Sequence, residues 1–335
     1  MKPVSISSPE LIRSRVCLVD GLTRTGKSLV CQLFPAFEGM EHPHFLTLLE
    51  QILPMMEHQA ISTDAAKALI RLHLNEFFCD YILARKANFR PNELTSIFRS
   101  LNPQKFFENL NKQDKPENLQ EFEKNNSNYF SFMTHDILTH FDLFKALELP
   151  YQIVTIYRDP IDTVWSWYKR GWGTRFTEDS RSFTTLVESD KEQKLPWWCL
   201  PIKDLYDKSK PIERCILMHN LLLKRAIYNT KNLTWNNGIL VLKFEDVCQN
   251  PIQAMHSISK FLNLTIDYRY PSYFEQAEVP RSLNPTDQTM KLEKIESATE
   301  PKIFKDLITL HNDYHNSFHG ISDHRIKELS LPMRI

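Results

Sequence analysis

Glycine is scarce in this chain. Only seven of its 335 residues are glycine, and two of these, Gly21 and Gly26, lie in one short segment. A surplus of either charge is also lacking, because 41 basic residues balance 41 acidic ones. A bulk nucleic-acid binder or a protein held on a membrane surface relies on a strong field of one sign. The composition argues against both classes, so we expect no nucleic-acid partner, and local basic sites remain open.

Closely spaced cysteines and long apolar runs are lacking as well. The six cysteines include no CxxC pair, which indicates scattered reduced thiols, mostly in the core, rather than disulfides or a metal knuckle. No stretch approaches the roughly 20 apolar residues of a membrane span, and the N-terminus lacks the apolar run of a signal peptide. We therefore expect a soluble, cytoplasmic protein without a membrane span.

Three short runs of aliphatic and β-branched residues predict buried strands, at residues 16–20, 152–157 and 238–243. Helical segments separate them, the longest at residues 211–230. Strands that alternate with helices indicate a parallel α/β sheet. We predict one α/β domain over residues 1–335, with three layers in which helices flank the parallel sheet.

Residues 40–127 are predicted to form a mainly helical insert in this domain. Apolar residues recur with helical spacing over residues 45–56, 65–83 and 94–101. Residues 111–128 instead carry mostly charged and amide side chains and almost no aliphatic ones. That composition predicts a mobile loop.

The two clustered glycines belong to residues 21–28, GLTRTGKS, which satisfy the phosphate-loop pattern G-x-x-x-x-G-K-[ST]. The segment lies between a predicted strand and a predicted helix. Such a loop turns backbone N–H groups toward an anion, and the helix N-terminus adds the positive end of its dipole. Glycine is needed where the chain adopts conformations that a Cβ atom would block. The segment therefore predicts a site for the phosphate groups of a nucleotide.

A second segment, YRDPIDTVWSWY at residues 157–168, places Arg158 at the end of a predicted strand and Ser166 on the helix that follows. A guanidinium group can hold a phosphate through two hydrogen bonds, and a nearby hydroxyl can bind another oxygen. The segment resembles the 3′-phosphate-binding segment of sulfotransferases that use 3′-phosphoadenosine-5′-phosphosulfate (PAPS). In that family an arginine ends the strand and a serine follows eight positions later, as Arg158 and Ser166 do here.

Three further segments resemble the same family in the same order. GLTRTGKS is similar to its 5′-phosphosulfate loop, with Arg24 at the basic position. Thr134-His135 resembles the Thr-His motif that carries the catalytic base in the cytosolic branch. KFED at residues 243–246 is similar to the Y-E-D-L segment.

The chain departs from the family in two places. Lys27 stands where the family usually has threonine, so a basic side chain enters the loop. The C-terminal R-K-G segment over the nucleotide is lacking, and Arg281-Ser282 is a candidate for a partial substitute.

The resemblance implies a P-loop NTPase-like sulfotransferase fold and a sulfotransferase that moves a sulfuryl group from PAPS to an acceptor hydroxyl. Transfer would be in line, with His135 as the general base and Arg24 stabilising the departing charge. The reaction would require no metal. The residues that the resemblance assigns to nucleotide binding are Thr23, Arg24, Thr25, Gly26, Lys27, Ser28, Arg158 and Ser166.

Alternatives remain open at this point. A P-loop kinase that uses Mg-ATP would need Lys27 as a Walker lysine and an aspartate for magnesium, for which Asp159 is the candidate. A non-catalytic protein of the same fold would bind the nucleotide without turnover. His135 could also be structural, because His140 lies five residues away and some branches of the family use a glutamate base.

The acceptor is expected to be a hydroxyl-bearing molecule, either a carbohydrate or a small alcohol or phenol. Aromatic side chains could form a platform for it, although core packing explains them equally well. The polar residues 171–194 are a candidate lid. The candidate aromatic residues are Trp165, Trp167, Tyr168, Trp172, Trp197 and Trp198.

Overall fold

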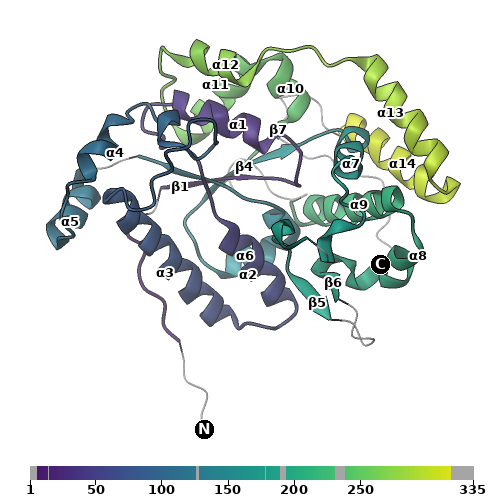
Figure 1. Ribbon diagram of the computed structural model, residues 1–335, viewed down its shortest axis with the longest axis horizontal. Coiled ribbons are helices and arrows are strands. Elements are labelled where there is room, and N and C mark those ends of the chain that lie inside the picture. The colour runs from purple at the N-terminus through teal and green to yellow at the C-terminus, as the bar shows by residue number, and fades with distance from the viewer. Residues whose placement is uncertain are drawn as a thin grey trace, which may run out of the picture.

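The computed structural model describes residues 6–13, 15–125, 128–177, 179–188, 194–230 and 238–317. A five-stranded sheet in the order β2-β3-β1-β4-β7 crosses the molecule (Figure 1). All four strand pairs are parallel, and Leu18 of the central strand β1 faces Phe132 on one side and Ile153 on the other. The strands are β1 (Val16–Asp20), β2 (His44–Phe45), β3 (Phe130–Met133), β4 (Gln152–Tyr157) and β7 (Ile239–Lys243).

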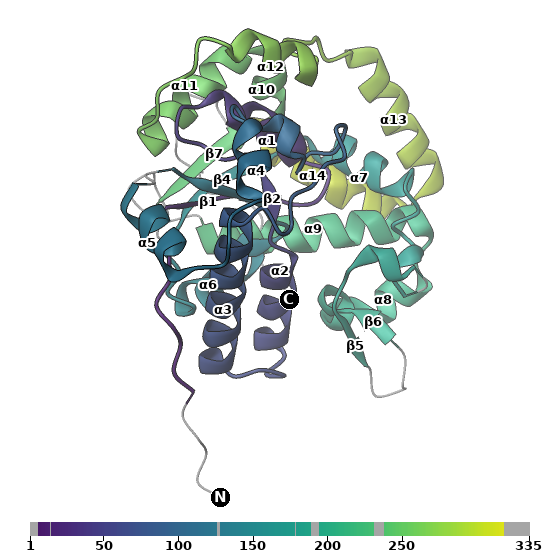
Figure 2. The ribbon, with the colours of Figure 1, turned by 60° about the vertical axis from the view of Figure 1, so that its left-hand side comes forward.

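Helices cover both faces of the sheet, which explains why nearly every residue of its inner strands is buried and why apolar residues dominate them. One face packs against α1 (Lys27–Leu33) and α11 (Pro251–Leu262). The other packs against α2 (Thr47–Glu57) and α3 (Thr63–Ile82), which run side by side in Figure 2. The predicted fold class, a parallel α/β sheet between layers of helices, is confirmed.

A third group of helices packs beyond the β4–β7 side of the sheet around Trp167 and Tyr314. Its members are α7 (Pro160–Tyr168), α9 (Pro211–Thr230), α13 (Pro285–Ala298) and α14 (Pro301–Ser317). The remaining helices are α4 (Gln104–Asn109), α5 (Pro116–Asn125), α6 (Phe141–Ala146), α8 (Lys203–Lys208), α10 (Phe244–Gln249) and α12 (Tyr270–Ala277).

Two predictions inside residues 40–127 are wrong. The stretch 111–128 is not a loop throughout, because α5 occupies Pro116–Asn125 and its Phe122 packs 6.0 Å from Phe130. Residues 94–101 contain only a 3₁₀ turn at Ile97–Arg99. There, Ser96 accepts a hydrogen bond from the N–H of Phe98, and bonds of this kind compete with a helix.

The short strand β2 joins residues 40–127 directly to the central sheet by pairing with β3. Residues 171–194, the candidate lid, include two 3₁₀ turns, β5 (Leu186–Glu188) and the first residue of β6 (Lys194–Pro196), which pairs antiparallel with β5. Residues 178 and 189–193 of this segment lie outside the described part of the chain.

The six cysteines all fall within the described residues and are unpaired, and five of them are buried. Within the same residues, no helix combines the length and the apolar character that crossing a membrane requires.

Candidate functional site

The phosphate loop connects the end of β1 to the start of α1. Gly21 and Gly26 have φ angles of 140° and 103°, which L side chains rarely adopt. A Cβ atom on Gly26 would lie 2.2 Å from Cδ2 of Phe244, so only glycine fits between the loop and this ring. Thr25 shapes the loop from inside, since its hydroxyl donates to the carbonyl oxygen of Leu22 at 2.8 Å.

Lys27 is buried beneath the loop. Its ammonium group donates to the carbonyl oxygens of Gly21 and Leu22, both at 2.6 Å. Burial lowers the pKa of Lys27, while the nearby carboxylates of Asp136 and Asp20 oppose that shift. The lysine that departs from the resembling loops therefore binds the loop's own carbonyl groups in this structure.

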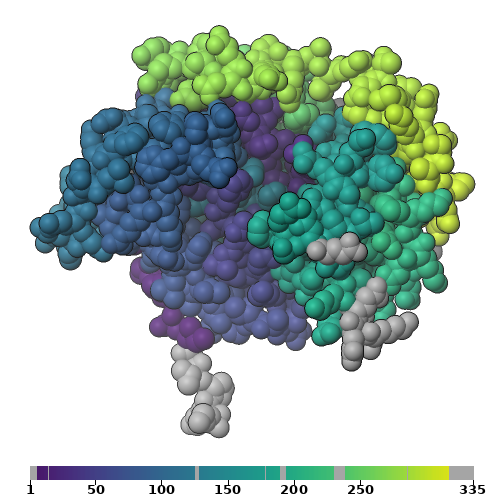
Figure 3. Space-filling view, in the orientation of Figure 1, coloured from purple at the N-terminus to yellow at the C-terminus, as the bar shows by residue number. Residues whose placement is uncertain are grey.

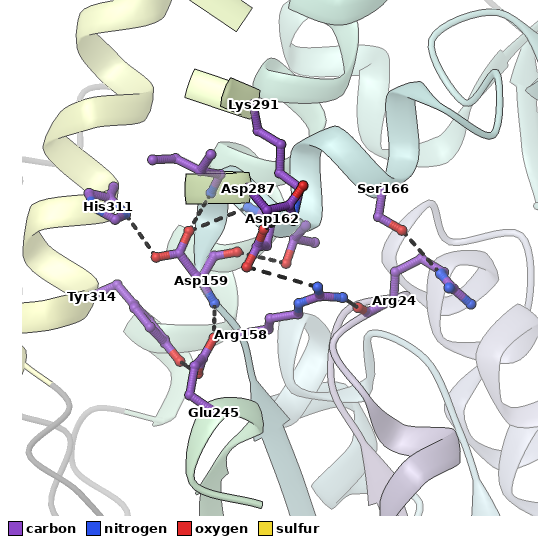
Figure 4. Close-up of polar contacts among 12 residues, drawn as sticks. Arg24, Arg158, Asp159, Asp162, Ser166, Glu245, Asp287, Lys291, His311 and Tyr314 are labelled. Carbon is purple, nitrogen blue, oxygen red and sulfur yellow. Dashed lines mark hydrogen bonds and ion pairs between the residues drawn. The ribbon is translucent and has the colours of Figure 1, made fainter. Parts of the chain in front are cut away.

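Two arginines, Arg24 and Arg158, lie beside the loop (Figure 4). The Nε atom of Arg24 donates to the hydroxyl of Ser166 at 3.2 Å, and Nη1 of Arg158 donates to the carbonyl oxygen of Arg24 at 3.2 Å. Burial lowers the pKa of Arg24, and the like charges of Arg170 and Arg158 lower it further. Mutual repulsion of this kind is relieved when an anion binds.

Protein contacts satisfy the guanidinium group of Arg158 only in part. Its guanidinium carbon lies 4.4 Å from the centre of the Phe244 ring, and Nη2 is 3.9 Å from Asp162. Its buried Nε atom has no hydrogen-bond partner among the described residues. A buried donor left unpaired is costly, so the protein does not fully satisfy this guanidinium group.

A cavity of about 400 Å³ opens between the loop, Arg158 and Phe244, and we call it the donor cavity. Arg281, the candidate substitute for the lacking C-terminal segment, also lines it. Thr25 and Ser166 are not among the described residues that line it; Thr25 bonds the carbonyl oxygen of Leu22, and Ser166 accepts a hydrogen bond from Arg24. Six of the eight predicted nucleotide-binding residues line the cavity: Thr23, Arg24, Gly26, Lys27, Ser28 and Arg158.

His135 lies just past the end of β3, in a turn that Asp20 holds. The Asp20 carboxylate accepts hydrogen bonds from the hydroxyl of Thr134 at 3.1 Å and from the backbone N–H groups of Ile137 and Leu138. Nδ1 of His135 lies 2.9 Å from Oε1 of Glu50 on α2. With a proton on Nδ1, His135 donates to Glu50 and leaves Nε2 as an acceptor.

A second cavity of about 350 Å³, the aromatic cavity, adjoins the first. His135 and Thr23 line both cavities, so the imidazole lies where the two meet. The surface is hollowed between the blue residues of the insert and the teal residues that follow α7, and the purple N-terminal segment is visible there (Figure 3). Among the apolar side chains that line the aromatic cavity are Trp167, Trp172, Phe176, Phe183, Trp197 and Trp198.

The other candidate residues predicted from the sequence lie in different places. Trp165 and Tyr168 pack against each other at 5.8 Å instead of lining either cavity. His140 lines only the aromatic cavity and lies 2.9 Å from Glu57. The carboxylate of Asp159 points away from the phosphate loop, because it caps α7 and lies against the histidines of α14. The aspartate that a magnesium-dependent kinase needs at the phosphates is therefore not supplied by Asp159.

Several residues of the site were missed in the sequence. Glu50 looked like an ordinary helix position, and Asp20 like the last residue of a strand. Phe244 was known only as part of the KFED segment. No local pattern marks these three, because each contacts the site through a residue far away in the chain.

Comparison with known proteins identifies the family. The sulfotransferase-domain profile matches residues 17–302. Similar solved structures include a sulfotransferase domain from the curacin biosynthetic pathway, with a TM-score of 0.45 and 11% identity, covering 90% of this chain and 99% of that one. A sulfotransferase from Mycobacterium avium has a TM-score of 0.44 and 11% identity, covering 93% of this chain and 78% of that one.

A sulfotransferase domain from the Synechococcus PCC 7002 olefin synthase has a TM-score of 0.41 and 15% identity, covering 94% of this chain and 98% of that one. Curated protein sequences yield no match. Because these TM-scores lie below 0.5, the assignment rests on the domain profile, which spans most of the chain. The chain belongs to the sulfotransferase domain family.

Proposed function

We propose that the protein transfers a sulfuryl group from PAPS to the hydroxyl of a small, largely apolar acceptor. The observation that carries the proposal is the position of His135 between the basic donor cavity and the aromatic cavity. A base in that position is within reach of an acceptor held in one cavity and of a group transferred from the other.

The donor cavity suits a nucleotide with two phosphorylated ends. The loop amides at the start of α1 and Ser28 would bind the 5′-phosphosulfate, as expected for a helix N-terminus preceded by a glycine loop. Arg158 would bind the 3′-phosphate, and its place in the wall of the donor cavity supports this assignment. Ser166 would share that phosphate after releasing Arg24. ATP lacks a 3′-phosphate and would leave Arg158 without this contact.

The transfer itself needs only a base and stabilised negative charge. Nε2 of His135 takes the proton of the acceptor hydroxyl as its oxygen attacks sulfur. The bond between sulfur and the bridging oxygen breaks, and its electron pair leaves with adenosine 3′,5′-bisphosphate. Arg24 and the loop amides stabilise the charge that develops on that oxygen. Glu50 keeps the proton on Nδ1 and stabilises the imidazolium that forms.

The aromatic cavity indicates the acceptor class. Its volume is within the range of small-molecule sites, and tryptophan and phenylalanine side chains supply much of its wall. Such a lining favours an aromatic or aliphatic alcohol or a phenol. Polar side chains also line this cavity, among them Gln51, Thr184 and Thr185, and they are available to the hydroxyl group of the acceptor.

Calorimetry with adenosine 3′,5′-bisphosphate and with ADP tests the donor assignment. We expect the bisphosphate to bind on the order of 10² to 10⁴ more tightly, in EDTA as well as in magnesium, from two charge-assisted contacts of about 1.5–3 kcal/mol each. Arg158→Ala should remove most of this preference. Arg90→Ala, which changes a largely exposed arginine of the insert, is the matched control and should keep it.

Tighter binding of ATP with magnesium would contradict the proposal and favour a kinase. Turnover assays with PAPS then test the acceptor class. One panel of acceptors contains phenols and apolar alcohols, and the other contains simple sugars. Turnover confined to the sugars would overturn the assignment of the aromatic cavity.

A further inference from the structure

Three side chains that could bind a metal ion converge outside the transfer site. His311 and His315 lie one turn apart on α14, and Asp159 lies at the N-terminus of α7. Figure 4 shows the contact between His311 and Asp159. One donor atom from each falls within 4.8 Å of the other two. The Asp159 side chain is only 2% exposed, and His315 is 46% exposed, so the group is buried on one side and open on the other.

The hydrogen bonding of this group is incomplete. Both imidazoles lie against the same carboxylate oxygen, Oδ2 of Asp159, with Nε2 of His315 at 2.7 Å and Nδ1 of His311 at 2.9 Å. The His311 nitrogen is buried, yet it does not reach hydrogen-bond geometry with any described residue. The contact between His311 and Asp159 is therefore an ion pair of poor hydrogen-bond geometry, in which two imidazoles share one carboxylate oxygen.

We propose that Asp159, His311 and His315 bind a divalent transition-metal ion of the Zn²⁺ type. Two imidazole nitrogens and one carboxylate oxygen are a common ligand set for zinc, with water in the fourth position. Bonds of about 2.0–2.2 Å in a tetrahedral site separate the ligand atoms by roughly 3.3–3.5 Å. The imidazoles need to withdraw from Asp159 by only several tenths of an ångström, which side-chain rotation supplies.

The carboxylate is already oriented for this role. Its other oxygen, Oδ1, accepts from the backbone N–H groups of Ile161 and Asp162 at 2.8 and 3.4 Å. Oδ2 is left facing the two imidazoles of α14. Outer hydrogen bonds that fix a ligand in this way increase metal affinity.

The ion would anchor α14 to the corner that holds Arg158, the residue before Asp159. Glu245 strengthens the same corner, because it accepts from the N–H of Asp159 at 3.0 Å and from the hydroxyl of Tyr314 at 2.5 Å. Asp159, His311 and His315 are not among the described residues that line the two cavities. The metal is therefore structural in this proposal, and the transfer reaction does not depend on it for chemistry.

Cobalt titration of the full-length, chelator-treated protein tests the site. Co²⁺ bound by two imidazoles and a carboxylate gives visible d–d absorption bands that hexaaqua Co²⁺ lacks in comparable intensity. We expect these bands to saturate at one equivalent and to disappear when Zn²⁺ displaces Co²⁺. His315→Ala and His311→Ala should each weaken binding at least tenfold, whereas His256→Ala, an exposed histidine on α11, should leave it unchanged.

Folding of each variant is checked by its circular dichroism and by its affinity for adenosine 3′,5′-bisphosphate. If His311→Ala does not fold, His315→Gln serves as the second variant, because the side chain of His315 is partly exposed. Zn²⁺ should also raise the melting temperature of the native chain and not that of the His315 variants. Absence of saturable Co²⁺ bands, or equal metal affinity in the native chain and both histidine variants, would overturn the proposal and leave the group as an ion-paired cap.

Discussion

His135 is the residue on which the proposed chemistry depends most. His135→Ala should reduce kcat at least ~10²-fold, because the acceptor hydroxyl loses its base, while the affinity for adenosine 3′,5′-bisphosphate stays nearly intact. Steady-state kinetics and calorimetry on the same preparation measure both. Near-normal turnover in His135→Ala would assign the base elsewhere, with Glu50 and Asp136, which also line the aromatic cavity, as the first candidates.

A variant of Glu50, which contacts His135, is a second test of the role proposed for His135. Glu50→Gln keeps an oxygen near Nδ1 but removes the negative charge. We expect a smaller loss of kcat than in His135→Ala, about tenfold, with the affinity for adenosine 3′,5′-bisphosphate unchanged. A parallel loss of kcat and of nucleotide affinity would indicate a purely structural role.

We expect the carboxyl group of Asp136 to lower the stability of the folded protein at neutral pH. Burial raises the pKa of Asp136 to about 7, despite the opposing charges of Lys27 and His135. In the unfolded chain this carboxyl ionises near its ordinary value of 3.8, so the folded state binds the extra proton between these values. The native protein therefore loses stability as pH rises from about 4 to 7.

Asp136→Asn removes this pH-dependent loss. Its left-handed backbone, with a φ of 60°, is one that asparagine tolerates. The free energy of unfolding of the variant relative to the native protein should rise between pH 4 and 7 and then level off, by at most about 4 kcal/mol. Urea unfolding of both proteins at pH 4.5 and at pH 8 measures it. The same difference at both pH values would contradict the assignment.

At the scale of elements, the phosphate loop is held partly by its own lysine. Lys27→Thr restores the residue that is usual in the resembling loops and removes the two bonds to the carbonyl groups of Gly21 and Leu22. We expect a lower melting temperature and nucleotide binding that is about tenfold weaker but still measurable, because the backbone amides remain. Calorimetry and thermal unfolding check the two effects.

Complete loss of nucleotide binding in a folded Lys27→Thr protein would show that Lys27 is the main phosphate ligand, as in a Walker loop. Ser28→Ala is the matched comparison, since it changes the neighbouring loop residue without removing the bonds to the carbonyl groups. The lid assigned to residues 171–194 stays a prediction. Its residues 182–185 border the aromatic cavity in the present arrangement.

At the scale of the whole molecule, we infer that residues 1–335 unfold as one domain. The insert, residues 40–127, adds β2 to the central sheet, and α2 brings Glu50 to His135. Five of the six tryptophans lie in residues 165–198, so fluorescence reports mainly on that region, whereas circular dichroism also reports on the helices of the insert. Urea transitions followed by the two signals should coincide. An insert that unfolds separately would give two different midpoints.

Local patterns in the sequence were sufficient for much of the fold and part of the site. Residues 16–33 form a strand, a glycine loop and a helix in direct succession. Arg158 lies at the end of β4, and Ser166, eight residues later, lies on the helix that follows. Backbone geometry over a few residues dictates such features, so they can be recognised without knowing the fold. Two assignments were wrong, the helix at residues 94–101 and the loop at residues 111–128. At the first, the Ser96 side chain bonds the N–H of Phe98, and at the second, α5 forms where Phe122 packs on Phe130, a contact that polar composition does not reveal.

Only the tertiary structure decided which distant residues complete the site. Glu50 and His135 are 85 positions apart, and Asp159 and His315 are 156 positions apart, yet each pair is in contact. Parallel strands bring their carboxyl ends to one edge of the sheet, and residues from separate segments meet there whatever their spacing in the chain. The sequence by itself determined the strand, glycine loop and helix at residues 16–33 and the strand and helix that carry Arg158 and Ser166. Long-range packing of the sheet, α2 and α14 determined the partner of His135, the aromatic cavity and the proposed metal site.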